Sequence, residues 1–223
     1  RLGGPMGLQW ALDVQCWAMF CALVARTGDV QMAAHTIVLR IVSVSFLPGH
    51  AFGDAASILT GQAHGAKAWG AARRVVNTAT WVSAIFMGSI GLLFLIDPEL
   101  LLSLFRPEHD VMALGVRLLT IAALFQVVDG VVMARQGALN GIGDTRFVMM
   151  ASVGTSWGLL LPTAWFLCTA MGLGAVGAWM SLMLQLVALS VIYWRRWDVM
   201  MPAVRDTVAP CGSASTASPT TAM

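Results

Sequence analysis

Long apolar segments separated by short polar breaks dominate the sequence. Between Phe147 and Trp194 there is no Lys, Arg, Asp, Glu or His. A helix that crosses a membrane needs about 20 apolar residues, so this stretch is long enough for two crossings joined by a glycine-rich turn from Met171 to Gly177. A soluble helix would instead carry an apolar stripe with a polar face beside it. The pattern therefore predicts membrane-spanning helices.

The same pattern continues along the whole chain and predicts six spans, each long enough to cross about 30 Å of hydrocarbon at about 1.5 Å per residue. They cover approximately residues 5–25, 32–63, 75–96, 111–136, 147–169 and 174–194. The predicted fold class is an all-α membrane protein, with a bundle of six transmembrane helices in residues 1–202. Residues 203–223, rich in Ser, Thr, Ala and Pro, are predicted to be a disordered cytoplasmic tail.

Two prolines and one leucine-rich break modify this picture. Pro48 lies inside the second span and Pro162 inside the fifth. Each removes a backbone donor and is expected to bend its helix, either as a packing kink or as a moving hinge. The break from Asp97 to Asp110 contains several leucines, which predicts a short helix on the outer membrane interface.

Composition and charge fit a membrane protein. Hydrophobic residues make up 58% of the chain and charged residues 11%, and the net charge of +2 is too small and too scattered to indicate a nucleic-acid partner. Basic residues concentrate on one side of the predicted membrane, which by the positive-inside rule places both ends in the cytoplasm. That side holds Arg1, Lys67, Arg73, Arg74, Arg146, Arg195, Arg196 and Arg205, whereas the opposite breaks hold Arg26 and Arg106. Because the chain starts with Arg1 rather than Met, we expect it to begin inside a longer protein.

Charged side chains inside the spans cost about 2.5–3.5 kcal/mol on insertion scales, so each needs a physical reason. Asp13 lies about eight residues, or ~12 Å, inside the cytoplasmic start of the first span, and Asp129 lies at a similar distance before the cytoplasmic end of the fourth. Two antiparallel helices therefore place carboxylates at matching depth. Such carboxylates either take up a proton or bind a cation together with neighbouring oxygens, and both are ways to couple ion flow.

Three further charged residues in the spans have explanations of their own. Arg40 is able to neutralise Asp13 or Asp129, which would make the acids structural. Asp54 either joins the site or is hydrated by a cytoplasmic vestibule, and Arg117 is close enough to the outer boundary to reach water.

Aromatic and histidine side chains near the acids are candidates for substrate contact. Trp10 and Trp17 flank Asp13 at helical spacing, and Phe125 lies one turn from Asp129. These aromatics either bind flat organic cations or simply pack and anchor. His35 fits a packing or hydrogen-bonding role at the start of the second span. His50 follows Pro48 by two residues and precedes Asp54 by four, so it either bonds a freed carbonyl or shares a face with that carboxylate.

Three sequence features that could suggest an enzyme or a metal site have simpler explanations. Gly154-Thr155-Ser156-Trp157-Gly158 fits the G-x-S-x-G form of serine hydrolases, but it lies in the middle of a span, with no strand before it and no His after it. Gly141-Ile142-Gly143-Asp144-Thr145 follows a helix rather than a strand, so it predicts a tight turn and not a phosphate loop. Cys16, Cys21 and Cys168 lie in apolar runs and Cys211 in the tail, which predicts neither a disulfide nor a metal site. We therefore expect a protein that is not an enzyme and holds no cofactor.

Five short segments, in their order and spacing, resemble the second half of multidrug and toxic compound extrusion (MATE) transporters, from their seventh helix to their twelfth. The segments are Pro5-Met6-Gly7-Leu8-Gln9 followed by Asp13, Ala33-Ala34-His35-Thr36-Ile37, Gly61-Gln62-Ala63-His64-Gly65-Ala66, Phe125-Gln126-Val127-Val128-Asp129, and Gly137-Ala138-Leu139-Asn140-Gly141-Ile142-Gly143-Asp144-Thr145-Arg146. Together they cover nearly everything before the tail.

The resemblance implies a twelve-helix antiporter of two six-helix lobes in the plasma (inner) membrane. Such a protein exports organic cations and drugs in exchange for H⁺ or Na⁺ by alternating access, and this chain would be its C-terminal lobe, with the N-terminal lobe as partner. The family's two cation-binding acids, which are the Na⁺ site where Na⁺ is used, fall on Asp13 and Asp129. The full hypothesis adds Asp54 and Gln126 as ion ligands, and Gln9, Trp10, Trp17, Arg40 and Phe125 in the substrate cavity.

Several residues depart from the family pattern. The first acid is usually Glu but is the shorter Asp13, and Phe125 lacks the phenolic oxygen of the Tyr found in some members. Arg40 replaces a small polar residue, and its charge would repel Na⁺. Asp54 is an additional acid, so the choice between H⁺ and Na⁺ stays open. Two alternatives also stay open: a lipid-linked sugar flippase, which would need a cationic cavity, and a non-transporting subunit whose buried charges pair.

Overall fold

The chain folds into long helices that lie roughly side by side. A computed structural model describes residues 3–200, so the predicted tail of 203–223 lies outside the described residues. Within residues 3–200, six helical segments are long and apolar enough to cross a membrane, which confirms the predicted all-α membrane fold. In chain order, the elements are α1 (Gly3–Ala25), α2 (Asp29–Gly65), α3 (Trp69–Ile96), α4 (Pro98–Ser103), α5 (His109–Gly141), α6 (Thr145–Thr155), the π-helical turn η1 (Ser156–Leu160), α7 (Leu161–Trp165), the π-helical turn η2 (Phe166–Ala170) and α8 (Gly174–Met200).

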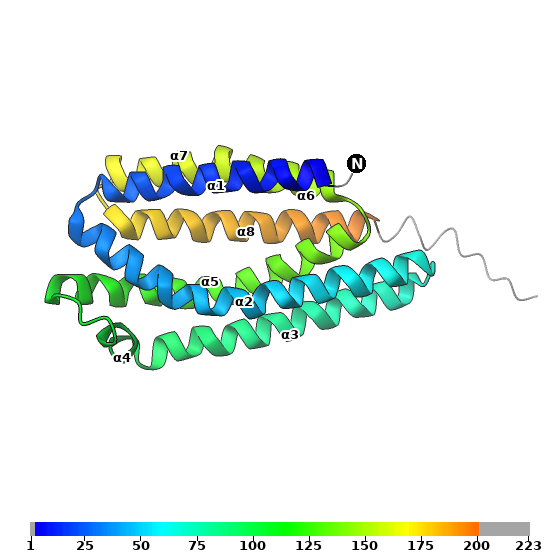
Figure 1. Ribbon diagram of the computed structural model, residues 1–223, viewed down its shortest axis with the longest axis horizontal. Helices are drawn as coiled ribbons and strands as arrows, with labels where there is room; N and C mark the ends of the chain where they lie inside the picture. The colour runs from blue at the N-terminus through cyan, green and yellow to red at the C-terminus, as the bar shows by residue number, and fades with distance from the viewer. Residues whose placement is uncertain (1–2, 201–223) are drawn as a thin grey trace, which may run out of the picture.

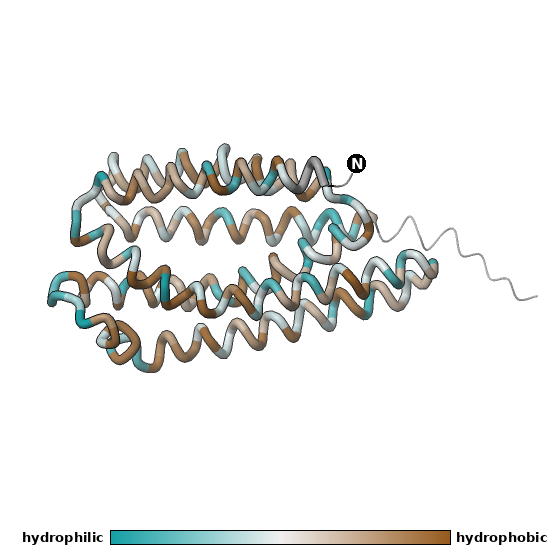
Figure 2. The backbone as a smooth tube through the Cα atoms, in the orientation of Figure 1, coloured by the Kyte–Doolittle hydropathy of each residue, from teal (hydrophilic) through white to brown (hydrophobic). Residues whose placement is uncertain are grey.

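The helices fall into two groups with α8 between them. Figure 1 shows α1 beside α6 and α7 on one side, and α2, α3 and α5 on the other. Apolar positions extend along the helices and polar positions gather toward the turns (Figure 2). Large apolar side chains on the outside, such as Leu47 at 76% and Trp81 at 71% exposed, suit a surface that meets lipid rather than water.

Close backbone contact joins α2, α3 and α5. A Cβ added to Gly130 of α5 would lie 2.9 Å from the backbone oxygen of Ser83 on α3, and one added to Gly61 of α2 would lie 3.0 Å from the backbone oxygen of Gly141. A Cβ at Gly137 would overlap the backbone oxygen of Gly53. In lipid the hydrophobic effect does not drive helices together, so close van der Waals packing of this kind stabilises their association.

The fifth long segment is not a regular α-helix throughout, in the region where Pro162 predicts a bend. It contains the two π-helical turns η1 and η2, and the N–H of Leu161 donates to the carbonyl of Ser156 across five residues. Pro162 lies in the first turn of α7, immediately after η1. Proline has no backbone N–H to donate, and the wider π-helical turn before it accommodates this gap in the helical hydrogen bonds. By contrast, Pro48 lies inside the continuous helix α2, which curves along its length in Figure 1.

The leucine-rich break forms the short helix that the sequence predicts. Pro98 begins α4, and the side chain of Asp97 caps it by accepting a hydrogen bond from the N–H of Leu100 at 3.0 Å. An acidic cap followed by proline is a strong helix start.

At the end of the helix bundle opposite α4, α8 is tied to the turn between α5 and α6. Arg196 Nε donates to Asp144 Oδ2 at 2.8 Å, and the same guanidinium lies 4.6 Å from the ring centroid of Phe147. Arg135 of α5 stacks over the ring of Trp194 at 3.6 Å.

One polar contact fixes the start of α8. The N–H of Ala175 donates to Gln31 Oε1 of α2 at 2.9 Å. Replacing Gln31 with leucine is expected to lower the free energy of unfolding by about 1 kcal/mol, because a half-buried backbone donor loses its acceptor. Thermal unfolding of the detergent-solubilised chain measures this, with exposed Gln62→Leu on the same helix as control. An equal loss in both variants would contradict the capping role.

Candidate functional site

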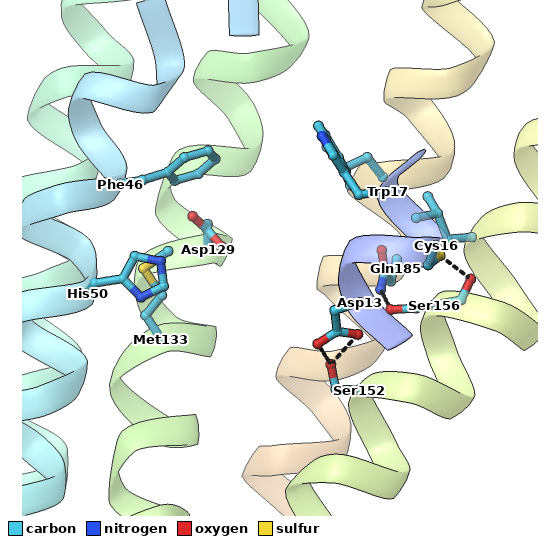
Figure 3. A pocket seen from close by; sticks show the side chains of 12 residues that line it. Asp13, Cys16, Trp17, Phe46, His50, Asp129, Met133, Ser152, Ser156 and Gln185 are labelled. Carbon is cyan, nitrogen blue, oxygen red and sulfur yellow. Dashed lines mark hydrogen bonds between the residues drawn. The ribbon is translucent and has the colours of Figure 1, made fainter. Parts of the chain in front are cut away.

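A cavity of about 380 Å³ lies between the two groups of helices. Figure 3 shows its two walls, one from α1, α6, η1 and α8, the other from α2 and α5. The lining consists of Asp13, Cys16, Trp17, Phe46, His50, Asp129, Met133, Ser152, Ser156, Leu160, Leu182 and Gln185. The cavity therefore brings Asp13 and Asp129, which are 116 positions apart in the chain, onto facing walls.

The wall that carries Asp13 is a network of polar side chains. Ser152 Oγ donates to the two carboxylate oxygens of Asp13 at 3.3 and 3.5 Å, so the carboxylate holds only a weak hydrogen bond there. Gln185 Nε2 donates to Ser156 Oγ at 2.8 Å, and Cys16 Sγ donates to the backbone carbonyl of Ser156 at 3.5 Å. Ser152 and Ser156 are four residues apart and face the cavity across the junction of α6 and η1.

The facing wall carries two residues from each of two helices, and the two residues on each helix are one turn apart. Phe46 and His50 come from α2, and Asp129 and Met133 from α5. Asp129 is only 6% exposed, and its Oδ2 has no hydrogen-bond partner among residues 3–200. An ionised carboxylate in such surroundings costs free energy unless it gains a proton or a cation. This oxygen is thus a place where a small cation would be stabilised.

Gln126 lies one turn before Asp129 but outside the cavity lining. Its side chain is fully buried, and its Nε2 donates to Ser45 Oγ of α2 at 2.5 Å. Gln126 therefore connects α5 to α2 immediately beside the wall that Asp129 occupies.

Of the aromatic candidates, Trp17 lines the cavity and the other two do not. Phe125 is buried and packs against Trp179, with ring centroids 5.6 Å apart. Trp10 is 72% exposed, and Gln9 is half-buried outside the lining.

The remaining charged candidates lie away from this cavity. Asp54 and Arg40 are both exposed on α2, and neither belongs to the lining. The ion pairs in the described part of the chain are His109–Asp110 and Arg196–Asp144. Arg40 consequently does not neutralise Asp13 or Asp129 in this structure.

The two histidines near the site have different environments. His35 is 1% exposed, and its Nδ1 accepts a hydrogen bond from Trp179 Nε1 at 3.0 Å, which is a packing role. His50 points into the cavity from the same helix as Phe46.

Some polar residues of the site were not among the sequence candidates. Ser152 and Gln185 stand in apolar runs, and only their polarity inside a stretch without charges could have drawn attention to them. Arg135, which lies outside the cavity lining, is 3% exposed and stacks on Trp194, and it was missed because it falls at the edge of the predicted fourth span.

Ser156 is not arranged as a nucleophile. Its hydroxyl oxygen accepts from the amide of Gln185, and no histidine within residues 3–200 hydrogen-bonds to it. General-base activation of a serine requires such a partner.

A family model, MatE, matches residues 5–166 of the chain. A probable multidrug resistance protein NorM from Brucella suis biovar 1 is 32% identical over 202 residues, which are 88% of this chain and 43% of that protein. The multidrug resistance protein NorM of Burkholderia vietnamiensis is 33% identical over 200 residues, 87% of this chain and 43% of that protein. The chain thus spans less than half the length of these relatives.

Solved structures share the fold. A crystal structure of MATE in the bent conformation superposes with a TM-score of 0.84 at 15% identity, covering 91% of this chain and 45% of that one. The outward-facing conformation of a multidrug resistance MATE family transporter gives a TM-score of 0.78 at 21% identity, over 86% of this chain and 43% of that one.

Proposed function

Because the chain belongs to the MatE family, we propose that it is one lobe of a membrane antiporter that exports organic cations and drugs in exchange for H⁺ or Na⁺. The observation that supports this most is the cavity with Asp13 and Asp129 on facing walls, where Asp129 Oδ2 has no partner in the described chain. The relatives named above are multidrug resistance proteins rather than enzymes.

In this proposal, the coupling ion binds at Asp129 and Asp13. A proton or Na⁺ at Asp129 cancels the buried charge, and its release leaves a carboxylate that attracts an organic cation. Trp17 and Phe46 offer ring surfaces on opposite walls, which suit a flat cation through cation–π contact. Ion and drug then bind different states of the lobe, so each shifts the population toward the state it prefers.

A single lobe gives one side of such a transport path. We propose that a second six-helix lobe closes the cavity, since the relatives are more than twice as long as the matched region. The proposed location is the plasma membrane with both ends of this segment in the cytoplasm, on the basis of the basic residues in the turns. A lipid-linked sugar flippase is less well supported, because the cavity lining within residues 3–200 carries two carboxylates and no Lys or Arg.

Efflux driven by an ion gradient tests this function. The variants Asp13→Asn and Asp129→Asn are expected to lower ethidium efflux by about tenfold or more, because the neutral amide takes up no proton and holds Na⁺ far more weakly than a carboxylate does. Cells or proteoliposomes with the chain, together with a second lobe where transport requires one, are energised by a pH or a Na⁺ gradient in turn. The gradient that drives efflux identifies the ion.

Asp54→Asn is the matched control, since it removes the same charge from an exposed site on α2 outside the cavity. It is expected to transport like the wild type. Membrane levels and elution volume are compared for all variants to separate misfolding from lost coupling. Wild-type efflux by both cavity variants would disprove the proposal.

A further inference from the structure

A second groove, of about 430 Å³, runs along α2 at the end of the lobe where that helix begins. In Figure 1 this is also the end at which α4 lies. The groove shares no residue with the cavity described above. Its walls include Asp29, Met32, Thr36, Ile37 and Arg40 of α2, together with Phe105 just after α4.

The groove carries two residues of opposite charge on the same face of α2. Asp29 and Arg40 are 11 positions apart, which is close to three helical turns and places them on one face of α2, about 16 Å apart along its axis. Side chains on a helix point toward its N-terminus, so Arg40 extends back along the groove in the direction of Asp29. Both are exposed, and neither belongs to an ion pair of residues 3–200.

Between these charges the groove is mainly apolar. Met32 and Ile37 lie half-buried on α2. Phe105 faces them from a tight turn, in which the N–H groups of Phe105 and Arg106 donate to carbonyls of α4 at 3.0 Å each. An arginine within an apolar span is costly unless its charge meets water or an anion.

We propose that this groove binds a zwitterionic phospholipid of the phosphatidylethanolamine type. The guanidinium of Arg40 pairs with the lipid phosphate, which suits its planar donors. The carboxylate of Asp29 pairs with the lipid ammonium, which is able to donate hydrogen bonds. Met32, Ile37 and Phe105 contact the carbons that join the ammonium to the phosphate, and the acyl chains leave the groove on the far side of Arg40. Asp29 and Arg40 are too far apart along α2 for a direct ion pair, so a ligand that carries a charge of each sign is needed to bridge them.

Lipid binding to the purified chain tests this directly. Native mass spectrometry in detergent compares phosphatidylethanolamine with phosphatidylglycerol, which has the same phosphate but no ammonium. The wild type is expected to bind phosphatidylethanolamine several-fold more tightly. Arg40→Gln is expected to weaken both lipids by about tenfold, whereas Asp29→Asn weakens phosphatidylethanolamine alone and brings the two affinities together.

Arg117→Gln is the matched control, because it removes an exposed basic side chain from α5 outside the groove. Glycerophosphoethanolamine, the head group without acyl chains, carries both charges that the groove pairs with, so it is expected to compete with phosphatidylethanolamine, and no competition would contradict the proposal. Binding that is unchanged in Arg40→Gln, or equal for the two lipids in the wild type, would overturn the proposal. The experiment needs no ion gradient, so its result is independent of the proposed transport function.

Discussion

Gly137→Ala is expected to lower the unfolding free energy of the chain by about 3 kcal/mol or more. Its added Cβ would overlap the backbone oxygen of Gly53 on α2, and a backbone atom of a packed helix has no freedom to turn aside. One turn further along α5, Gly141 lies against the backbone of Ser57 in the same way. The two helices would have to separate along this contact, and a large loss of folded protein follows.

Gly154→Ala provides the comparison for this variant. Gly154 also lies in a membrane-spanning helix, but an added Cβ there meets no other atom within 4 Å. We expect its stability to match or slightly exceed that of the wild type, because alanine favours helix more than glycine does. Unfolding of both variants by increasing SDS, followed by circular dichroism, measures the difference. Similar midpoints for the two would show that α2 and α5 tolerate separation.

Trp179→Ala is expected to cost about 3–5 kcal/mol of stability. Trp179 of α8 is 1% exposed, packs against Phe125 of α5, and donates to His35 of α2 at 3.0 Å. Its removal leaves a cavity where three helices meet and a buried imidazole nitrogen without its donor. Trp179→Phe keeps most of the ring contact and loses the N–H, so a smaller loss of about 1–3 kcal/mol is expected.

Trp165→Ala separates this effect from a general loss of aromatic surface. Trp165 is 59% exposed on α7, so its replacement removes the same side chain from the outside of the bundle. Less than about 1 kcal/mol is expected from it. The same SDS titration ranks the three variants, and an order other than Trp179→Ala, Trp179→Phe, Trp165→Ala would contradict the packing role of Trp179.

Hydropathy predicted the six membrane helices because lipid selects for apolar length, which is visible in a single sequence. Where the helices end is less well determined: α2 starts at Asp29, three residues before the predicted span, since a charged first turn is compatible with a helix that reaches water. The π-helical turns around Leu161 left no trace in hydropathy, because one extra residue per turn does not change how apolar a segment is.

The charges of the candidate site were predictable only in part, because Asp13 and Asp129 line the cavity whereas Asp54 and Arg40, chosen by the same argument, do not. The expense of a carboxylate in lipid singled out Asp13 and Asp129, and the structure places both at one cavity. Which neighbours they face depends on how six helices pack. The hypothesis from the sequence included Gln126 as an ion ligand beside Asp129, whereas in space Gln126 turns toward Ser45 on α2. Ser152 approaches Asp13 from a helix 139 positions away in the chain.

The length of α2 has a practical consequence. Its 37 residues extend for about 55 Å, well beyond the ~30 Å thickness of a bilayer's hydrocarbon, and its junction with α3 projects past the neighbouring helices in Figure 1. His50, on the wall of the cavity, and Gly65, at the far tip, belong to the same unbroken rod. A spin label or fluorophore attached at that tip would therefore report a tilt of the wall from a water-accessible position, without any chemical change inside the cavity.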